Sequence, residues 1–338
     1  MEKPINILGI ESSCDDTSVS VIQNGKILTN FTANQNVHLE YGGVVPELAS
    51  RAHQKNIVPV VSEAIRKAGI EKRDLNAIAY TIGPGLLGSL LVGSSFAKGM
   101  AASLNIPLLE INHMEAHILA HFINHALEDI SFPFLNLTVS GGHTQLVIVE
   151  NDLSMRVIGQ TKDDAAGEAF DKCGKLLGLG YPAGPLLDRH AKSGNPKAFE
   201  FPKSSMQGFD YSFSGLKTAF LYFLRDEREK EENFIANNLN DLCASLQENI
   251  VDVLLSKLRK AARHHGIKSI GIAGGVSANS RLRSAFEELG KKEKWNTYIP
   301  DFEYCTDNGA MIAMSGYFKY QNQLFGSLRS KPLARLKI

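Results

Sequence analysis

The sequence predicts an α/β protein made of two similar lobes, and three observations lead to this prediction. Apolar, β-branched runs alternate with helical patterns along the whole chain, the same order of elements occurs twice, and the chain has 338 residues, enough for two domains at about 100–200 residues each. We expect a first lobe over residues 1–132, a second lobe over 133–325 and a tail over 326–338. An inserted segment rich in Gly, Pro, Ser and aromatic residues is expected within the second lobe, at about 178–228.

The first lobe is predicted to open with a three-stranded meander. Residues 5–11 are apolar, residues 17–23 alternate, and Asn24-Gly25 is a strong hairpin signal before a third strand at 26–32. The elements that follow are a helix at 46–68 that Pro59 kinks or divides, a strand at 77–81, a helix at 89–104, a strand at 107–111 and a helix from His113 to about His125.

After Phe132-Pro133 the same plan begins again. Strands are predicted at 134–140, 144–150, 155–160, 269–273 and 298–300, and helices at 165–177, from Asp241, at 279–289 and from Asp307. We interpret the repetition as an internal duplication, with two unrelated α/β domains as the alternative. Two such lobes would form a cleft between their strand-end loops.

The composition excludes several classes of protein. Hydrophobic residues make up 43% and charged residues 21%, which excludes a disordered chain, and the 29 glycines show no collagen period. Lys+Arg and Asp+Glu balance at 36 each, so a large basic surface for nucleic acid is not visible, although a local patch remains open.

No run of residues is long and apolar enough for a membrane span, and the N-terminal residues do not resemble a signal peptide. Cys14, Cys173, Cys243 and Cys305 are far apart and form no CxxC pair. Reduced thiols in a cytoplasmic protein are therefore expected, without membrane association.

Three glycine-rich turns follow predicted strands, at 83–88, 140–142 and 274–279. Glycine lets backbone N–H groups approach a phosphate, and the N-terminus of a following helix adds a positive dipole. Neither a P-loop nor a clean GxGxxG is present, so a single turn is weak support. Three turns in matching positions favour a nucleotide ligand.

His113 and His117 lie four residues apart in HMEAH, so a helix would place both on one face toward one metal ion. Glu115 is two residues after the first histidine, about 200° around the helix, which argues against a zinc-protease site. His121 and His125 continue the spacing, as a larger site or as a solvated stripe. Histidines with purely structural roles remain the alternative.

Asp307 heads the equivalent helix of the second half, where it could be a simple N-cap or the third ligand. Under the duplication it would complete a His/His/Asp set across the two lobes, which suits Fe(II), Zn or Mn. Among the carboxylates near 163–171, Asp171 lies deepest in its predicted helix. Aromatic and basic residues interleave over 203–217, either to stack RNA or to pack among themselves.

The chain resembles the TsaD family, the tRNA N6-adenosine threonylcarbamoyltransferases. The motifs that carry the resemblance run in order from about residue 7 to 316: GIESSCDDTSVSV, YGGVVPELASRAH, YTIGPGLLGSLLVG, NHMEAH, TVSGGHTQL, DDAAGEAFDK, LLGLGYPAGP, YSFSGLKT, AGGVSANSRLR and CTDNGAMIA. Ala116 and Ala183 stand where the family often has glycine, which loosens the local comparison slightly.

The resemblance implies an actin/sugar-kinase-like duplicated fold and an enzyme that transfers threonylcarbamoyl from threonylcarbamoyl-AMP to N6 of adenosine 37, in tRNAs that read codons beginning with adenine. It also implies tRNA as substrate, TsaB and TsaE as partner proteins, and TsaC as the source of the intermediate.

By the same resemblance, His113, His117 and Asp307 correspond to ligands of one divalent metal ion, iron by preference. Residues similar to the family's substrate contacts are Thr138, Val139, Ser140, Gly141, Gly142, Asp171, Gly184, Asp188 and Asn279. No catalytic side chain is assigned beyond the metal site. The rival functions are a phosphotransferase of the same fold and a nucleotide-binding subunit without catalytic activity.

Overall fold

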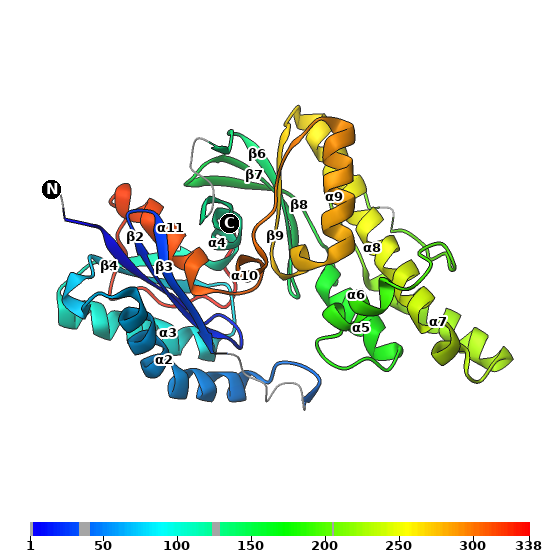
Figure 1. The fold of residues 1–338 in the computed structure, drawn as a ribbon, viewed down its shortest axis with the longest axis horizontal. Helices are drawn as coiled ribbons and strands as arrows, with labels where there is room; N and C mark the ends of the chain where they lie inside the picture. Colours follow the sequence, from blue (N-terminus) through cyan, green and yellow to red (C-terminus); the bar gives the residue numbers. More distant parts are fainter. Residues whose placement is uncertain (1–2, 34–40, 124–128, 205) are drawn as a thin grey trace. The chain divides into compact units, whose positions relative to one another are not determined.

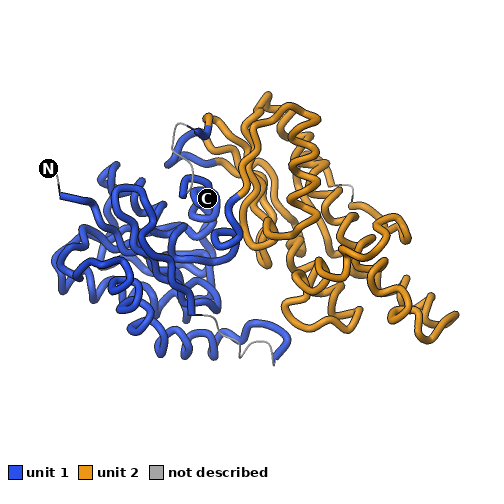
Figure 2. Tube along the Cα trace, viewed as in Figure 1, with its two compact units in different colours: residues 1–130, 150–155, 300–338 blue, residues 131–149, 156–299 orange. Residues whose placement is uncertain are grey.

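The computed structural model describes residues 3–33, 41–123, 129–204 and 206–338. The chain divides into two compact units, each built around a five-stranded sheet. Unit 1 comprises residues 1–130, 150–155 and 300–338, and unit 2 comprises residues 131–149 and 156–299 (Figure 2).

The sheet of unit 1 has the strand order β3-β2-β1-β4-β5. Its strands are β1 (Asn6–Glu11), β2 (Thr17–Gln23), β3 (Lys26–Ala33), β4 (Ala77–Gly83) and β5 (Leu108–Asn112). The first three form an antiparallel meander, and β4 and β5 extend the sheet in parallel from β1. The meander is the one predicted from the sequence, whereas the parallel pairing of β4 and β5 is established by the structure.

Helices cover both faces of this sheet (Figure 1). On one face α2 (Pro46–Ala68) and α3 (Leu87–Leu104) pack on Leu8 and Ile10 of β1. On the other face lie α4 (His113–Leu119) and α11 (Gly309–Gln321), with Gly9 of β1 directed toward α11 because side chains alternate along a strand. The remaining elements in the described part of unit 1 are the 3-10 turns η1 (Lys72–Asp74) and η2 (Ala120–Ile123) and the short helix α10 (Phe302–Cys305). Helix α2 continues through Pro59 and is not divided there.

The sheet of unit 2 has the order β10-β9-β6-β7-β8. Its strands are β6 (Phe134–Val139), β7 (Thr144–Asn151), β8 (Ser154–Gln160), β9 (Ser269–Ala273) and β10 (Asn296–Tyr298). The helices are α5 (Ala166–Leu176), α6 (Ala183–Ala191), α7 (Ser214–Lys230), α8 (Phe234–His265) and α9 (Ser280–Glu293), with the 3-10 turn η4 (Gly275–Ala278). Strands β6 to β10 are connected in the same order as β1 to β5, so the predicted duplication is confirmed.

One expectation for unit 2 needs correction, and one open alternative is decided. Helix α8 begins at Phe234, so Asp241 lies inside it, where its Oδ1 accepts the N–H of Asn195 at 2.7 Å. Tyr211 and Phe213 belong to the core, with 1% and 2% of their surface exposed, which supports the alternative that the aromatic residues of this segment pack among themselves.

The last helix of the chain belongs to unit 1, although the sequence pattern assigned residues 300–325 to the second lobe. Close contact between backbones explains this placement. A Cβ atom on Gly9 would lie 2.5 Å from the backbone nitrogen of Ala313, and one on Gly309 would lie 2.6 Å from that of Ser20. Glycine at both positions lets α11 lie directly on β1 and β2.

Within the described part of the chain, no helix has the length and apolar character that crossing a membrane requires.

Candidate functional site

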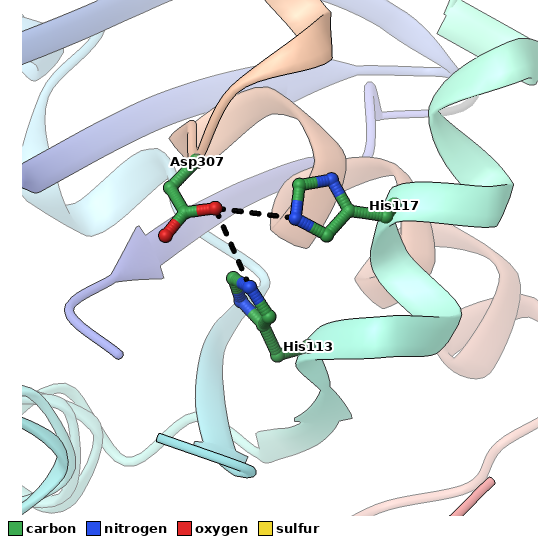
Figure 3. A group of neighbouring side chains, drawn as sticks. All are labelled: His113, His117 and Asp307. Carbon is green, nitrogen blue, oxygen red and sulfur yellow. Dashed lines mark hydrogen bonds and ion pairs between the residues drawn. The ribbon is translucent and has the colours of Figure 1, made fainter. Parts of the chain in front are cut away.

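Helix α4 directs two histidines at one carboxylate (Figure 3). The Nε2 atoms of His113 and His117 lie 3.4 Å and 3.1 Å from Oδ1 of Asp307. The two rings are perpendicular, with centroids 4.7 Å apart. The predicted ligands are thus brought together, and one ligand atom from each lies within 4.8 Å of the others.

Asp307 lies just before α11 and does not cap it. The cap is Asn308, whose Oδ1 accepts the N–H of Met311 at 2.9 Å. The carboxylate of Asp307 is therefore not used by the helix and faces α4. All three ligands belong to unit 1, so the expectation that a metal ion would join two lobes is wrong: α11 carries Asp307 onto the first sheet.

A second carboxylate lies behind His113. Glu11 ends β1 and is fully buried, and its Oε2 is 3.0 Å from Nδ1 of His113 and accepts the hydroxyl of Thr81 at 2.6 Å. The hydroxyl oxygen of Ser13 lies 3.2 Å from the same Nδ1. With its N–H donated from Nδ1 to Glu11, His113 turns Nε2 toward Asp307, and Nε2 is the nitrogen that this orientation leaves for a metal ion.

The electrostatics favour a cation at this position. Burial alone would lower the pKa of His113, but the charges of Glu11 and Asp307 outweigh it and raise that pKa well above its ordinary value. Burial likewise opposes ionisation of both carboxyls, yet His113 holds the pKa of Glu11 below its ordinary value and that of Asp307 well below it. The buried carboxylate of Glu11 and the partly exposed carboxylate of Asp307 thus stabilise positive charge, as a proton or as a metal ion.

This donor set fits a divalent transition metal. Two imidazole nitrogens and one carboxylate, with further positions open, are typical of Fe(II) and also suit Zn and Mn. Glu115 is not part of the group: burial raises its pKa, with Lys319 as its opposing charge. His121 is buried in η2 outside the group, and His125 lies outside the described residues.

The loop expected to bind substrate follows β6 in unit 2. The side chains of Thr138 and Val139 are fully buried at the end of the strand, whereas Gly141 and Gly142 are exposed. A Cβ atom on either glycine would meet nothing within 4 Å, so the chain is open to approach here. Ser140 closes the turn by accepting the N–H of His143 on its hydroxyl at 3.1 Å.

Contacts join this loop to two helices. Gly167 at the start of α5 donates its N–H to the carbonyl of Ser140 at 3.2 Å. One helical turn further, Oδ1 of Asp171 accepts the N–H groups of Ala183 and Gly184 at 2.8 and 3.2 Å, at the start of α6. Burial raises the pKa of Asp171, and these two hydrogen bonds only partly offset it.

The other predicted substrate residues complete a ring of contacts in unit 2. Asp188 of α6 accepts the hydroxyl of Ser280 at 2.7 Å, next to Asn279. The turn that leads to Asn279 approaches β6, because a Cβ on Gly274 would lie 2.5 Å from the carbonyl oxygen of Val139. The segments that carry the nine predicted substrate residues are therefore linked to one another by these contacts.

Two groups that were predicted to contact the ligand already form hydrogen bonds within the protein. Asn279 caps α9 by accepting the N–H of Leu282 at 2.9 Å, and its Nδ2 donates to Gln247 at 2.7 Å. In the first glycine-rich turn, Leu86 donates its N–H to the carbonyl of Ser13 at 2.7 Å. That N–H is therefore not directed at a phosphate.

Glu11, Ser13 and Thr81 were missed by the sequence reasoning, although Glu11 carried a usable signal. It is a carboxylate that directly ends an apolar strand, where a buried charge requires a partner. The four cysteines are free thiols, as expected.

Comparison with solved structures gives the fold. The chain is similar to full-length HypF in its phosphate- and nucleotide-bound form, with a TM-score of 0.61 and 13% identity over 96% of this chain and 47% of that one. It is also similar to component A of the (R)-2-hydroxyglutaryl-CoA dehydratase of Acidaminococcus fermentans, with a TM-score of 0.52 and 17% identity over 94% and 99% of the two chains. The fold is the duplicated actin/sugar-kinase-like one.

Comparison of sequences gives the family. The chain is 57% identical to a tRNA N6-adenosine threonylcarbamoyltransferase of Porphyromonas gingivalis over all of both chains. It is 51% identical to one of Salinibacter ruber over 92% of this chain and 93% of that one. The family model described as TsaD, tRNA N6-adenosine threonylcarbamoyltransferase, matches residues 26–314. The chain therefore belongs to the family of tRNA N6-adenosine threonylcarbamoyltransferases.

Proposed function

We infer that the protein transfers the threonylcarbamoyl group of threonylcarbamoyl-AMP to N6 of adenosine 37, in tRNAs that read codons beginning with adenine. The observation that carries this function is the identity of 57% over the full length to a relative named for it. The protein is thus an enzyme of the transferase class.

The chemistry needs little from the protein beyond placement and charge stabilisation. The N6 amine attacks the carbamoyl carbon, the bond from that carbon to the phosphate oxygen breaks, the amine loses a proton, and AMP leaves. Because the donor is already a mixed anhydride, no side-chain nucleophile is required. A site that orients the two reactants and stabilises negative charge on the carbonyl oxygen suffices.

His113, His117 and Asp307 would hold one divalent metal ion, Fe(II) by preference and Zn or Mn as alternatives. Such an ion, when bound, supplies a Lewis acid and a template for the reacting groups. Glu11 orients His113 from behind and keeps its Nδ1 protonated, which leaves Nε2 for the metal. The convergence of the three ligand atoms in unit 1 supports this assignment.

The substrate contacts are proposed in unit 2. The open backbone at Gly141 and Gly142 suits the phosphate of the adenylate, and Ser140 shapes that turn. Asp171 and Gly184 set the start of α6 beside it, and Asp188 and Asn279 border the same patch. Thr138 and Val139 would contribute through their backbone, because their side chains are buried.

We also propose that the protein works with others. Formal net charge is zero, whereas tRNA binding draws on several Lys or Arg contacts to phosphates. TsaB and TsaE are the expected partners and TsaC the expected supplier of the adenylate, all in the cytoplasm where tRNA is modified.

Reconstitution tests the function. Purified chain, TsaB, TsaE and TsaC are combined with threonine, bicarbonate, ATP and tRNA, and the nucleosides are analysed by mass spectrometry. N6-threonylcarbamoyladenosine that requires the chain is the expected result. A phosphorylated small molecule formed from ATP by the chain alone would favour a phosphotransferase instead.

A further inference from the structure

We propose that residues 326–338, which we call the strap, position the metal-ligand helix α4 through the side chain of Asn112. The inference rests on the proposed metal site, since it concerns the helix that carries two of its ligands. It makes Asn112 a positioning residue, because its side chain is bonded to protein groups and acts through α4.

The strap first runs beside β5. The N–H of Gly326 donates to the carbonyl of Leu108 at 2.8 Å, and the N–H of Ser327 donates to Oε1 of Glu110 at 2.8 Å. Both acceptors belong to the strand that leads directly into α4. The strap is therefore attached to the same strand that delivers the first metal ligand.

The strap then crosses the end of β4. Leu333 donates its N–H to the carbonyl of Ile82 at 2.8 Å, and the carbonyl of Ala334 accepts the N–H of Gly85 at 3.2 Å. A Cβ atom on Gly83 would lie 2.0 Å from the carbonyl oxygen of Leu333. Only glycine leaves room for the strap at this point.

The strap ends its path at the N-cap of α4. Asn112 is 5% exposed, and its Oδ1 accepts the N–H groups of Met114 at 2.9 Å and Glu115 at 3.4 Å. Since the amide oxygen is used by the helix, the NH₂ group points the other way and donates to the carbonyl of Lys337 at 3.1 Å. One buried amide thus links the first turn of α4 to the strap.

This link controls where the ligands lie. His113 follows Asn112 directly, and His117 is one helical turn further, so a shift of the cap moves both imidazoles relative to Asp307. Groups behind metal ligands typically change metal affinity by about 10–100-fold when they are lost. We expect an effect at the lower end, because Glu11 still holds His113.

Cobalt(II) titration of the full chain tests the inference, since the visible absorption of the ion reports its ligand geometry. Asn112→Ser keeps a capping hydroxyl but is too short to reach Lys337, and a chain that ends at Pro332 removes the contact from the other side. We expect each to bind cobalt about tenfold more weakly, with a changed spectrum. Lys337→Ala is the matched control and should behave as wild type, because the contact uses the backbone carbonyl.

Hydrogen exchange in the metal-free protein gives an independent measurement. The amides of Met114 and Glu115 should exchange faster in the shortened chain than in wild type. If the shortened chain does not fold, Asn112→Ser carries the test. Wild-type cobalt affinity, spectrum and exchange in that variant would overturn this inference alone, whereas failure of the wild-type chain to bind cobalt would overturn the metal site and this inference together.

Discussion

His113 lies between two carboxylates, and this arrangement sets a competition at its Nε2 atom. In the metal-free protein Glu11 and Asp307 keep the imidazole protonated at a pH where an ordinary histidine has lost its proton. A metal ion must displace that proton before Nε2 can bind it.

Metal loading should therefore rise with pH, with a midpoint above the ordinary histidine pKa of about 6.5. Glu11→Gln keeps the shape of the side chain but removes one charge, so the pKa of His113 falls and the proton competes less. Its loading midpoint should move to lower pH, while affinity at high pH falls about tenfold. Cobalt titrations at several pH values measure both, and an unchanged midpoint would contradict the assigned role of Glu11.

The same groups make the stability of the metal-free protein depend on pH. The pKa of His113 is raised, so its contribution is present below the ordinary histidine pKa and is lost as pH rises through the raised value. The pKa of Glu11 is lowered, so its contribution is lost as pH falls through the lowered value. Thermal melts should show the largest gap between wild type and Glu11→Gln at roughly pH 4.5–6.5, between the two ordinary values.

The three ligands should act as one unit. His113→Ala, His117→Ala and Asp307→Ala should each lose most bound metal and most transfer activity, and the triple variant should be hardly worse than any single one. Metal analysis and tRNA nucleoside assays measure this. Glu303→Gln, an exposed carboxylate on α10, is the control. Full metal content and near-normal transfer in Asp307→Ala would refute the site.

Among the elements, α11 delivers Asp307, and its position depends on glycine. Gly9→Ala would place a methyl group against the backbone of Ala313, so we expect a loss of about 1–3 kcal/mol in unfolding free energy together with weaker metal binding. Gly99→Ala in helix α3 is the matched control, because a Cβ atom at that position would meet nothing within 4 Å. This control should raise the unfolding free energy by up to about 1 kcal/mol, because alanine favours a helix more than glycine does. Denaturant melts and cobalt titrations compare the two. If Gly9→Ala is destabilised but binds metal with unchanged affinity, the packing of α11 on β1 does not determine the position of Asp307 in the metal site.

Asn279 caps helix α9, so an alanine variant would lose both this cap and any contact with the ligand. Asn279→Ala should lower stability by about 1 kcal/mol through loss of the cap, and adenylate binding by about 1–3 kcal/mol if the amide contacts the ligand. Asn279→Asp keeps the capping oxygen and loses only the NH₂ donor. Calorimetry with a stable adenylate analogue should show weakened binding in both variants, and wild-type affinity in Asn279→Asp would leave Asn279 as a cap only.

The helices and strands also show how much of the structure can be predicted from the sequence. The order of elements along the chain, the opening meanders and the duplication follow from local periodicity and are confirmed, and the spacing of the two histidines predicts the single helix face on which they lie. The placement of α11 could not be predicted in this way, because it depends on the close contact between Gly9 and Ala313, which are some 300 residues apart in the sequence. The same holds for Glu11 behind His113, for the strap on Asn112, and for the cap at Asn308 that leaves Asp307 unused by its helix.

The charge of the whole molecule argues for assistance in capturing tRNA. With 36 basic and 36 acidic residues, the chain has no net attraction for a polyanion. The purified chain supplied with threonylcarbamoyl-AMP should modify tRNA with little turnover, and addition of TsaB and TsaE should raise the rate. Nucleoside analysis over time measures it, and efficient multiple turnover by the chain alone would contradict the prediction.

The path of the chain through its two units has a consequence for how the protein is made. All of unit 2 lies between residues 130 and 300, so unit 1, which regains only residues 150–155 in that stretch, is completed by residues 300–338. During synthesis, in which N-terminal parts emerge first, His113 and His117 are present long before Asp307. A chain halted anywhere in unit 2 carries two histidines without their carboxylate and lacks α11 over its first sheet. The proposed metal site can therefore form only in chains that have been translated past Asp307.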